Sequence, residues 1–455
     1  MISKISGWSW WWKDGSNGEG EVVVSVLVAV LVVASWYIIR RSRRNGMLPP
    51  GPRSFLKLQL DATFANRDPP IAASVLSYGA IDIVWNSNNP EWRMLRKISI
   101  HELFSNKNLD SCYDHCRQEV RKIVRDLYYK IDAPINICEQ VFLTALIVIM
   151  GMLWGGKLEG EERTSVGAEF RQLFDEMVEL MERPNVSDLF PVLRWFDIQG
   201  IERRAKTLSG GMEWILNSVI DQHMKMDKAN QVHKESKNFI KFLLELMEQQ
   251  DAKTQMTMPH LKALFIDIVG AGTDTTSTTV EWAMTEMMQH PQVMRKVQEE
   301  LDEVVGMNNM VEESHLLKLH YVDAVVKETL RLHPPAPPVD SALSQFILHS
   351  WDPEAWDNPL DFRPERFLSD FKKYDYRGND YNYLPFCSGR RICVGLTLGE
   401  TMVKFVLACL LHSFDWRLPE GTSLDFTEKF GIVLKKWTPL VAIPNPRLLN
   451  LELYN

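Results

Sequence analysis

The sequence contains no long run of basic residues, and its charge balance is acidic. Lysine and arginine total 51 against 59 aspartates and glutamates, which gives a formal net charge of -8. Proteins that bind nucleic acid through its phosphates need clustered positive charge. We therefore expect no nucleic-acid partner, although a local basic face could still receive an acidic protein.

Cysteine is also scarce, with six residues in a chain of 455. Disulfide frameworks are typical of short, cysteine-dense secreted chains, so we interpret most of these residues as reduced, buried thiols. Cys112, His115 and Cys116 supply only half of a zinc-ligand set, and no second pair lies close by in the sequence. Buried helix thiols are the better interpretation of these positions.

An uncharged apolar run covers residues 22–39 and is followed at once by arginines at 40, 41, 43 and 44. A run of this length can just span a bilayer, and the trailing arginines favour the cytosolic side. A cleaved signal peptide would have its basic residues before the run, and a buried core element would not sit easily beside four arginines. The pattern predicts a lumenal segment over 1–21, a membrane anchor over 22–39, a basic and proline-rich hinge over 40–56, and a cytosolic domain over 57–455.

Apolar spacing within this domain predicts mostly helix. A long helix is expected over residues 258–288 with an interruption at 270–272, and strand-like pieces such as 430–434 occur only near the C-terminus. Other expected boundaries are a helix from Pro291 to Gly306, a helix capped by Ser314 that runs to about Leu332, and a helix that starts near Gly395. The fold class is therefore mainly α with a small β region.

One ten-residue segment combines Phe386, Gly389, Arg391, Cys393 and Gly395. It resembles the haem-binding loop of cytochromes P450, Phe-x-x-Gly-x-Arg-x-Cys-x-Gly, at every fixed position. The resemblance implies that haem b is the cofactor and that Cys393 is the axial ligand of its iron, a thiolate kept ionised by backbone N–H groups in a glycine turn. It also implies that Arg391 binds a haem propionate and that Phe386 shields the sulfur. A glycine-rich loop with a buried cysteine is the less favoured alternative.

The segment from Ala271 to Thr276 resembles the oxygen-activation segment of the same family. Ala271 and Gly272 are small enough to leave room for dioxygen. The hydroxyl of Thr275 can hold a water chain that delivers protons, and Asp274 can connect that chain to solvent. The resemblance makes Asp274 and Thr275 catalytic candidates. Alone, the segment fits a threonine-rich kink in a core helix equally well, and without a preceding strand it is a poor dinucleotide fingerprint.

Two weaker motifs gain weight from their order along the chain. Glu328 and Arg331 share a helix face, and in the family such a pair meets a later arginine, here Arg366, in a buried ion network that positions the haem loop. Trp92 and Arg96 also share a helix face, and the family places this pair against a haem propionate. Each pair alone would be interpreted as a surface helix feature.

Together these motifs identify the chain as similar to plant microsomal P450 monooxygenases. The resemblance implies a single-pass protein of the endoplasmic reticulum. It would hydroxylate or epoxidise a small hydrophobic metabolite, of terpenoid or flavonoid type, with dioxygen and electrons from NADPH-cytochrome P450 reductase. Basic residues could form the docking face for that reductase: Arg93, Lys97, Arg117, Arg121 and Lys122.

Two segments are shorter than the family pattern, one between Pro52 and Phe64 and one between Pro337 and Trp351. The family builds its first strands and a strand beside the substrate there, so we expect an incomplete β region and an altered pocket wall. These shortened segments favour the alternative of a non-catalytic membrane haem protein, or of an unstable product with no pocket. A separate second alternative is a haem-dependent isomerase or dehydratase of the same fold. The second would not need the Asp274–Thr275 pair and ranks below the others.

Overall fold

The computed structural model describes residues 65–154, 160–229, 239–248, 256–336, 350–368, 374–380, 382–429 and 431–454. The chain divides into two compact units, Met1–Gln59 and Leu60–Asn455. The expected lumenal segment, membrane anchor and hinge fall in the first unit and lie outside the described residues. The second unit contains every element discussed below.

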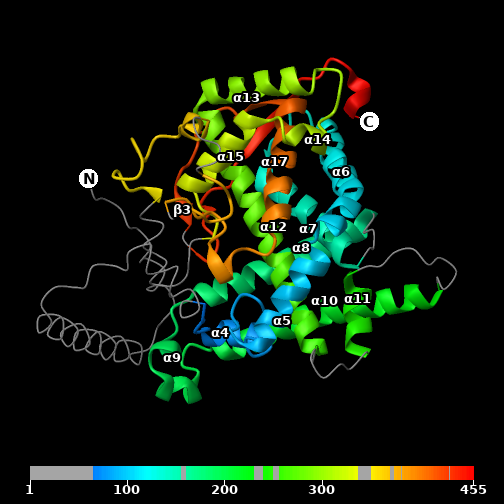
Figure 1. Ribbon diagram of the computed structural model, residues 1–455, viewed down its shortest axis with the longest axis vertical. Helices are drawn as coiled ribbons and strands as arrows, with labels where there is room; N and C mark the ends of the chain where they lie inside the picture. The colour runs from blue at the N-terminus through cyan, green and yellow to red at the C-terminus, as the bar shows by residue number, and fades with distance from the viewer. Residues whose placement is uncertain are drawn as a thin grey trace, which may run out of the picture. The chain divides into compact units, whose positions relative to one another are not determined.

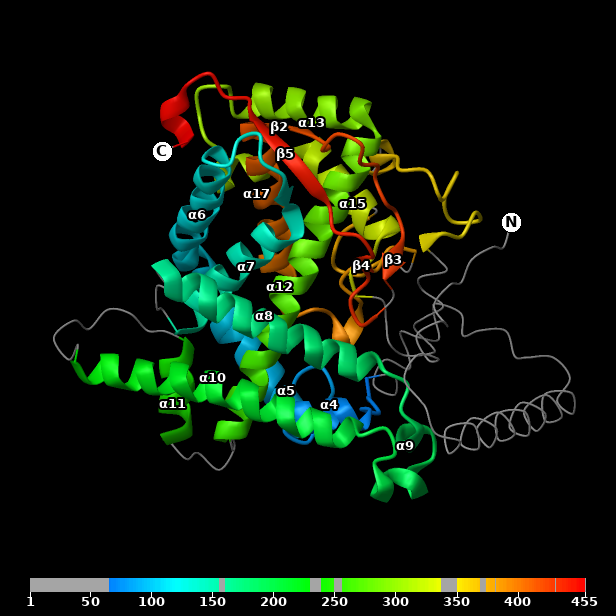
Figure 2. The ribbon, with the colours of Figure 1, turned by 180° about the vertical axis from the view of Figure 1, so that it is seen from behind.

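Long helices form the centre of this unit (Figure 1). Helix α12 (Met258–Gln289) packs along α7 (Ile137–Trp154) and contacts α17 (Leu396–Ser413), while α6 (Asn106–Tyr128) lies against both α7 and α17. Helix α13 (Pro291–Val304) crosses one end of this group, above α15 (His320–Leu332) in Figure 2. Almost the whole length of α12 is buried, so it forms the core to which the other elements are attached.

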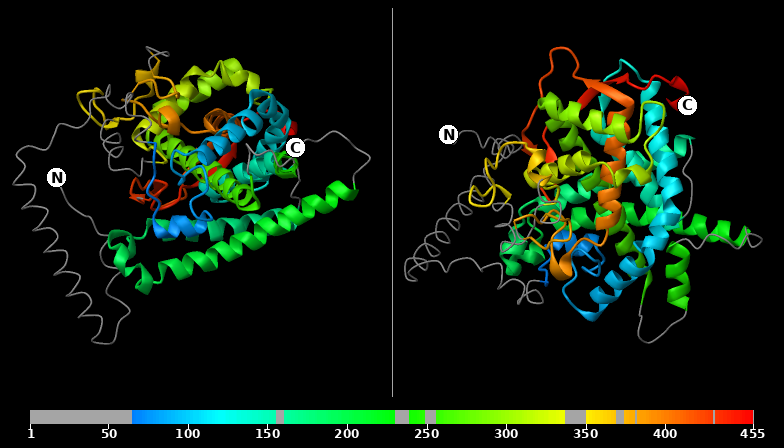
Figure 3. Two further views of the ribbon diagram at one scale, coloured as in Figure 1. Left: turned by 60° about the horizontal axis from the view of Figure 1, so that its bottom comes forward. Right: turned by 45° about the horizontal axis from the view of Figure 1, so that its top comes forward.

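A second group of helices lies at the opposite end from α13, as the tilted views of Figure 3 show. Helix α10 (Ile201–Ala229) packs against α4 (Ile71–Leu76) and α8 (Gly160–Glu182). The other elements here are α5 (Pro90–Ile98), π-helix η2 (Ser99–Leu103), α9 (Val186–Leu189), 3-10 helix η3 (Pro191–Phe196) and α11 (Phe239–Glu248).

The expected interruption of the long helix at Gly270–Gly272 is wrong, because α12 runs unbroken from Met258 to Gln289. Its start has Pro259 in the first turn and a capping box between Thr257 and His260. A Cβ at Gly270 would overlap the ring of Phe174, and one at Gly272 would lie 2.5 Å from Cδ1 of Ile149. These glycines therefore permit close packing by neighbouring helices and do not break α12.

The β region is small. Strand β5 (Val441–Pro446) pairs antiparallel with β1 (Ile135–Asn136) on one side and with β2 (Phe414–Arg417) on the other. A separate antiparallel pair joins β3 (Glu428–Lys429) to β4 (Lys435–Lys436), so the expected strand over 430–434 is wrong and its described part forms the connection. Among the described residues no strand precedes β1. The mainly α fold class is confirmed.

The boundaries expected for three other helices can be compared with the structure. Helix α13 begins at the predicted Pro291 and ends two residues before Gly306, and α17 begins directly after Gly395. Ser314 does not cap the helix that ends at Leu332: it lies inside the short helix α14 (Glu313–Leu316), which Glu312 caps, and a turn separates α14 from α15. Among the described helices, α17 is long and apolar enough to cross a membrane, but 67% of it is buried in this unit, as in a core helix.

Candidate active site

The loop of residues 386–395, here called the cysteine loop, leads directly into α17. Cys387 and Gly389 have φ values of 60° and 62°, and a single 3-10 turn, η5 (Gly389–Arg391), follows. The N–H of Cys393 donates to the carbonyl of Phe386 at 3.0 Å, which closes the loop. Gly395 is the N-cap of α17, so the sulfur of Cys393 lies near the positive end of a helix dipole.

The Cys393 thiol is accessible to solvent, although protein surrounds it densely enough to desolvate it. Burial raises its pKa to about 11, while the N–H of Gly395 and the charge of Arg96 act in the opposite direction. A thiol in this environment ionises when a metal cation binds to it. An accessible sulfur that receives a backbone N–H is the donor that a haem iron requires, and the cysteine loop therefore fits this group.

Aromatic and glycine residues pack against the cysteine loop. The ring of Phe386 lies edge-on to Tyr376, with ring centres 5.8 Å apart, and rests beside Gly399 of α17. Gly378, with φ of 71°, passes so close to the loop that a Cβ there would overlap the carbonyl oxygen of Cys387. Sequence motifs did not identify Gly378, because its constraint comes from a contact between separate segments.

The residues expected at the haem propionates are brought together around Trp92. The guanidinium groups of Arg391 and Arg96 lie 4.3 and 5.2 Å from the centre of the Trp92 ring. Arg96 donates to the carbonyl of Ile392 at 2.7 Å and so ties α5 to the cysteine loop. These three side chains carry the cation and N–H groups expected to bind a carboxylated cofactor. In this structure the N–H groups of Trp92 and Arg391 donate to backbone carbonyls of Ala65 and Ile83.

Thr275 lies on the accessible face of α12, together with Ala271 one turn earlier. The hydroxyl of Thr275 donates to the Ala271 carbonyl at 2.6 Å, which leaves its oxygen lone pairs for another donor. Ala271 is exposed and Thr275 half-buried on a helix that is otherwise almost wholly buried. The expected oxygen-activation segment therefore lies where a ligand could reach it.

Asp274 points the other way, into the protein. Its Oδ2 lies 2.8 Å from Nζ of Lys435 on β4, and the same ammonium group is 3.0 Å from Oδ1 of Asp175 on α8. Burial raises the pKa of Asp274 and Lys435 opposes that rise. The sequence did not single out Lys435 or Asp175, which reach Asp274 only through the tertiary fold.

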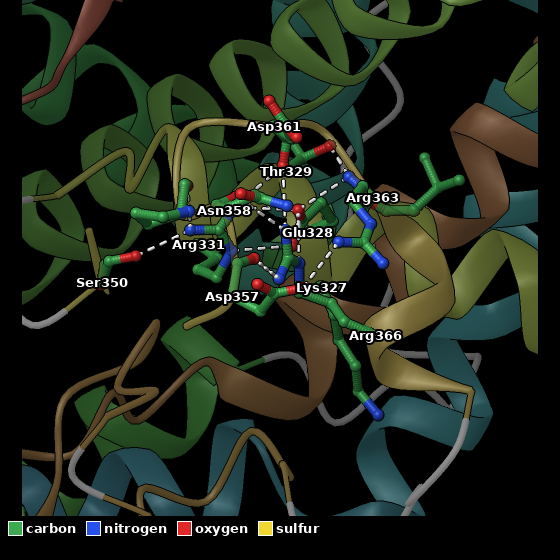
Figure 4. Close-up of polar contacts among 12 residues, drawn as sticks. Lys327, Glu328, Thr329, Arg331, Ser350, Asp357, Asn358, Asp361, Arg363 and Arg366 are labelled. Atoms are coloured by element: carbon green, nitrogen blue, oxygen red, sulfur yellow. Dashed lines mark hydrogen bonds and ion pairs between the residues drawn. The ribbon is translucent and has the colours of Figure 1, made fainter. Parts of the chain in front are cut away.

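Glu328, Arg331 and Arg366 form a buried ion network (Figure 4). Arg331 binds Glu328 with two hydrogen bonds of 2.8 and 2.9 Å, and Nε of Arg366 lies 3.0 Å from the same carboxylate. Neither Glu328 nor Arg331 is exposed to solvent. The remaining N–H groups of Arg331 reach backbone carbonyls of Ser350, Pro359 and Asp361. The structure thus brings the three side chains together; that they position the cysteine loop is a proposal.

Aromatic side chains connect this network to the cysteine loop. Both guanidinium groups lie over the ring of Trp356, at 5.2 and 5.9 Å. Successive ring contacts then lead to Phe386: Trp356, Phe367, Tyr383, Tyr376 and Phe386. Close-packed rings transmit displacement, so this path gives the network a physical means of fixing the loop.

The expected basic docking face is partly neutralised. Arg117 and Arg121 bind Glu312, and Lys122 lies 2.6 Å from Glu119. Arg93 and Lys97 of α5 are exposed. The neighbouring Arg96 contacts the cysteine loop, so α5 presents these two cations beside the candidate site.

Comparisons with known proteins agree with this geometry. The cytochrome P450 family model matches residues 52–347 and 344–442. Similar proteins include a flavonoid 3'-monooxygenase of Petunia hybrida, 36% identical over 87% of this chain and 81% of the relative, and a flavonoid 3',5'-hydroxylase of Campanula medium, 33% identical over 88% and 82%. A zebrafish cytochrome P450 structure with progesterone superposes with a TM-score of 0.71, at 23% identity over 86% of this chain and 91% of that one, and shows the fold. The two matched stretches meet at residues 344–347, inside one of the two segments that the sequence predicted to be shortened.

Proposed function

Because the chain belongs to the cytochrome P450 family of haem-dependent monooxygenases, we propose that it hydroxylates or epoxidises a small hydrophobic metabolite of flavonoid or terpenoid type. Electrons would come from NADPH through a separate reductase. The relatives named as flavonoid hydroxylases support the flavonoid class. The observation that carries the proposal is the accessible Cys393 thiol, held by the Gly395 N–H at the start of α17.

The proposal assigns a separate role to each residue of the candidate site. The bound haem supplies the binding and reductive cleavage of dioxygen. Cys393 would hold the iron, and Trp92, Arg96 and Arg391 would bind the carboxylates of the cofactor. The two arginines already lie over the ring of Trp92 in the structure.

Thr275 and Asp274 would deliver protons to the reacting oxygen. The Thr275 oxygen is accessible and can accept a hydrogen bond from a water molecule on its way to the reacting oxygen. Asp274 is tied to Lys435, so its carboxyl group has a fixed position on the inner side of α12. The two groups are adjacent in sequence but face different surroundings, which suits a path from the protein interior to the accessible face.

The first experiment is the reduced, carbon-monoxide-bound difference spectrum of the full chain in microsomes. We expect the red-shifted Soret band that thiolate ligation produces. Cys393→Ser should lose this band, whereas the matched variant Cys387→Ser in the same loop should keep it. A native spectrum in Cys393→Ser would overturn the ligand assignment.

The second experiment measures turnover in the same microsomes, supplied with reductase, NADPH and a flavanone. A product heavier by one oxygen atom supports the proposal, and Thr275→Ala should consume NADPH while it forms less of that product. Haem binding without product from flavonoid or terpenoid substrates would favour the non-catalytic alternative. The match interrupted at residues 344–347 is the observation that keeps this alternative under test.

For the cellular location, we propose the endoplasmic reticulum membrane, with the catalytic unit on the cytosolic side. The apolar run 22–39 and its arginines support an anchor. On the described unit, η3 and its neighbours expose large apolar side chains, which is typical of a surface that contacts a membrane or a protein: Leu189, Val192, Trp195, Phe196 and Ile198. The full chain should stay with the membrane pellet after alkaline carbonate extraction, and its release would contradict a spanning anchor.

For the reductase, we propose that Arg93 and Lys97 on α5 contribute to docking. Exposed cations next to a redox site steer an acidic partner and mainly affect the association rate. Lys97→Glu should raise the reductase concentration needed for half-maximal turnover. An unchanged value would remove α5 from the docking face.

A further inference from the structure

Segment 82–86, which precedes α5, is attached to α12 through two aspartates. Oδ1 of Asp82 accepts hydrogen bonds from the N–H groups of Trp85 and Asn86, at 2.7 and 3.2 Å. Oδ2 of Asp267 on α12 accepts from the N–H groups of Ile83 and Val84, at 2.8 and 3.3 Å. Two carboxyl groups thus bind four consecutive backbone N–H groups.

The carbonyl side of the same segment is attached to the cysteine loop. The Ile83 carbonyl accepts from Nη1 of Arg391 and from Nε1 of Trp92, both at 3.0 Å. Arg391 also donates to the carbonyls of Val84 and Asn86. Segment 82–86 therefore lies between α12 and the residues expected to bind the cofactor. A displacement of the segment relative to α12 would also displace its carbonyl groups relative to Arg391 and Trp92.

The two carboxyl groups contact each other. Asp82 and Asp267 lie close enough to share a hydrogen bond, and Oδ2 of Asp82 is buried with no protein N–H or hydroxyl donor among the described residues. A hydrogen bond between carboxyl groups requires a proton on one of them. Burial raises the pKa of Asp82 to about 6, and burial and the charge of Asp82 raise that of Asp267 well above its usual value. Both shifts favour retention of one proton by the pair.

The charged groups on the surrounding elements are occupied elsewhere. Arg391 binds the carbonyl side of the segment. Glu91 of α5 accepts from the Asn86 side chain at 3.1 Å and lies 2.7 Å from Nε2 of His260 on α12. Nδ1 of His260 in turn accepts from the N–H of Thr257 at 3.1 Å. These groups are thus engaged away from the two aspartates, so the proton itself is what offsets the repulsion between Asp82 and Asp267.

We propose that Asp82 and Asp267 are positioning residues that share one proton, and that this proton fastens segment 82–86 to α12 and so sets the wall of the substrate space. Asp267 lies one turn before Ala271 and two turns before Thr275, on the same accessible face of α12. Loss of the proton places two charges in contact and drives the segment away from α12. The role of the wall in substrate binding rests on the proposed function, whereas the fastening itself does not.

The test uses Asp267→Asn in the full chain, because a carboxamide reproduces the protonated carboxyl group at every pH. Its oxygen can accept from Ile83 and Val84, and its N–H groups can donate to Asp82. Hydrogen–deuterium exchange of a peptide covering residues 82–86 is measured without substrate from about pH 6 upward, corrected for the intrinsic exchange rate. Protection in the wild type should fall about tenfold for each pH unit above the last ionisation of the pair, while protection in Asp267→Asn should stay constant.

Asp82→Asn serves as the second variant and should also abolish the pH dependence, because the shared proton belongs to the pair. A wild-type protection that does not change with pH would overturn the proposal. So would an Asp267→Asn variant that follows the wild-type curve while it keeps the wild-type carbon monoxide spectrum.

Binding of a flavanone, followed by the spectral shift of the haem, tests the consequence for the pocket. The dissociation constant of the wild type should rise with pH, and that of Asp267→Asn should not. If the exchange result holds but no flavanone binds, the fastening stands and the proposed substrate class fails. If binding is observed without the difference in exchange, the proposed function stands and the fastening fails.

Discussion

Gly378 shows how a single residue outside any recognised motif can control the cysteine loop. It has a φ of 71°, and the space for a Cβ is filled by backbone and side-chain atoms of Cys387 and Ser388. Gly421, with φ of 74°, has the same unfavourable conformation for a side chain but no neighbour within 4 Å. A substitution at Gly421 would therefore cause backbone strain alone, whereas one at Gly378 would cause the same strain and a clash with the loop.

We expect Gly378→Ala to displace the cysteine loop and to lower the fraction of protein with the thiolate spectrum at least several-fold. Gly421→Ala carries the same strain of about 1 kcal/mol or more and should keep that spectrum. The measurement is the carbon monoxide difference spectrum per mole of purified protein. Equal spectra in the two variants would show that the close approach of Gly378 does not constrain the loop.

At the scale of elements, the ion network joins α15 to the 3-10 helix η4 (Pro364–Phe367). Arg366 and Arg363 are three residues apart but differ in their surroundings. The Arg366 side chain is 10% exposed and bound to Glu328, whereas the Arg363 side chain is 46% exposed and pairs with the exposed Asp357. This contrast provides a matched pair of variants.

Arg366→Met should destabilise the fold by about 3–5 kcal/mol, because it leaves the charge of Glu328 undercompensated in the interior. Arg363→Met should cost less than about 1 kcal/mol, since its ion pair is solvated. Urea denaturation of the two variants, followed by circular dichroism, checks the difference. Similar midpoints for both would contradict a buried network. If Arg366→Met still binds haem, the network stabilises the fold but does not position the cysteine loop.

Across the whole molecule, His333 connects elements that are distant in sequence. It follows α15, stacks on Trp282 of α12 at 3.9 Å, and its Nε2 and Nδ1 lie 2.8 and 3.1 Å from Glu286 and Glu428. A neutral imidazole can donate to only one of these carboxylates, so both bonds require the protonated ring. Burial alone would lower the pKa of His333, but the two carboxylates outweigh it and raise that pKa.

The raised pKa fixes the sign of a pH effect. The stabilisation from protonated His333 is complete below the unfolded pKa of about 6.5 and is lost as the pH rises through the higher folded value. The free energy of unfolding of the wild type minus that of His333→Gln should therefore be largest in mild acid and should shrink toward alkaline pH. Urea titrations at a series of pH values measure it. A constant difference would show that the ring is neutral in the folded state.

Much of the candidate site could be predicted because it depends on local sequence. The turn that presents Cys393 needs glycines at fixed spacing, and the four-residue spacing of Trp92 and Arg96 places them on one helix face before any fold is known. Helices α13 and α17 were also predictable, since Pro291 and Gly395 mark their starts.

Local signals failed where distant segments supplied the physical cause. Gly270 and Gly272 resemble helix breakers in sequence, yet Phe174 and Ile149 approach α12 so closely there that a Cβ would force these side chains to move. Ser314 has the chemistry of a cap, but α14 starts one residue earlier, at Glu313.

The sequence by itself therefore determined the family, the helical fold class and the residues expected to hold the cofactor, because each depends on spacing along a single segment. The tertiary structure alone decided which groups meet across segments: Lys435 with Asp274, Trp356 with Arg331 and Arg366, and Asp82 with Asp267. These contacts join residues 10 to 185 positions apart. Buried charges must find partners wherever the folded chain brings them, and no periodicity in the sequence records that choice.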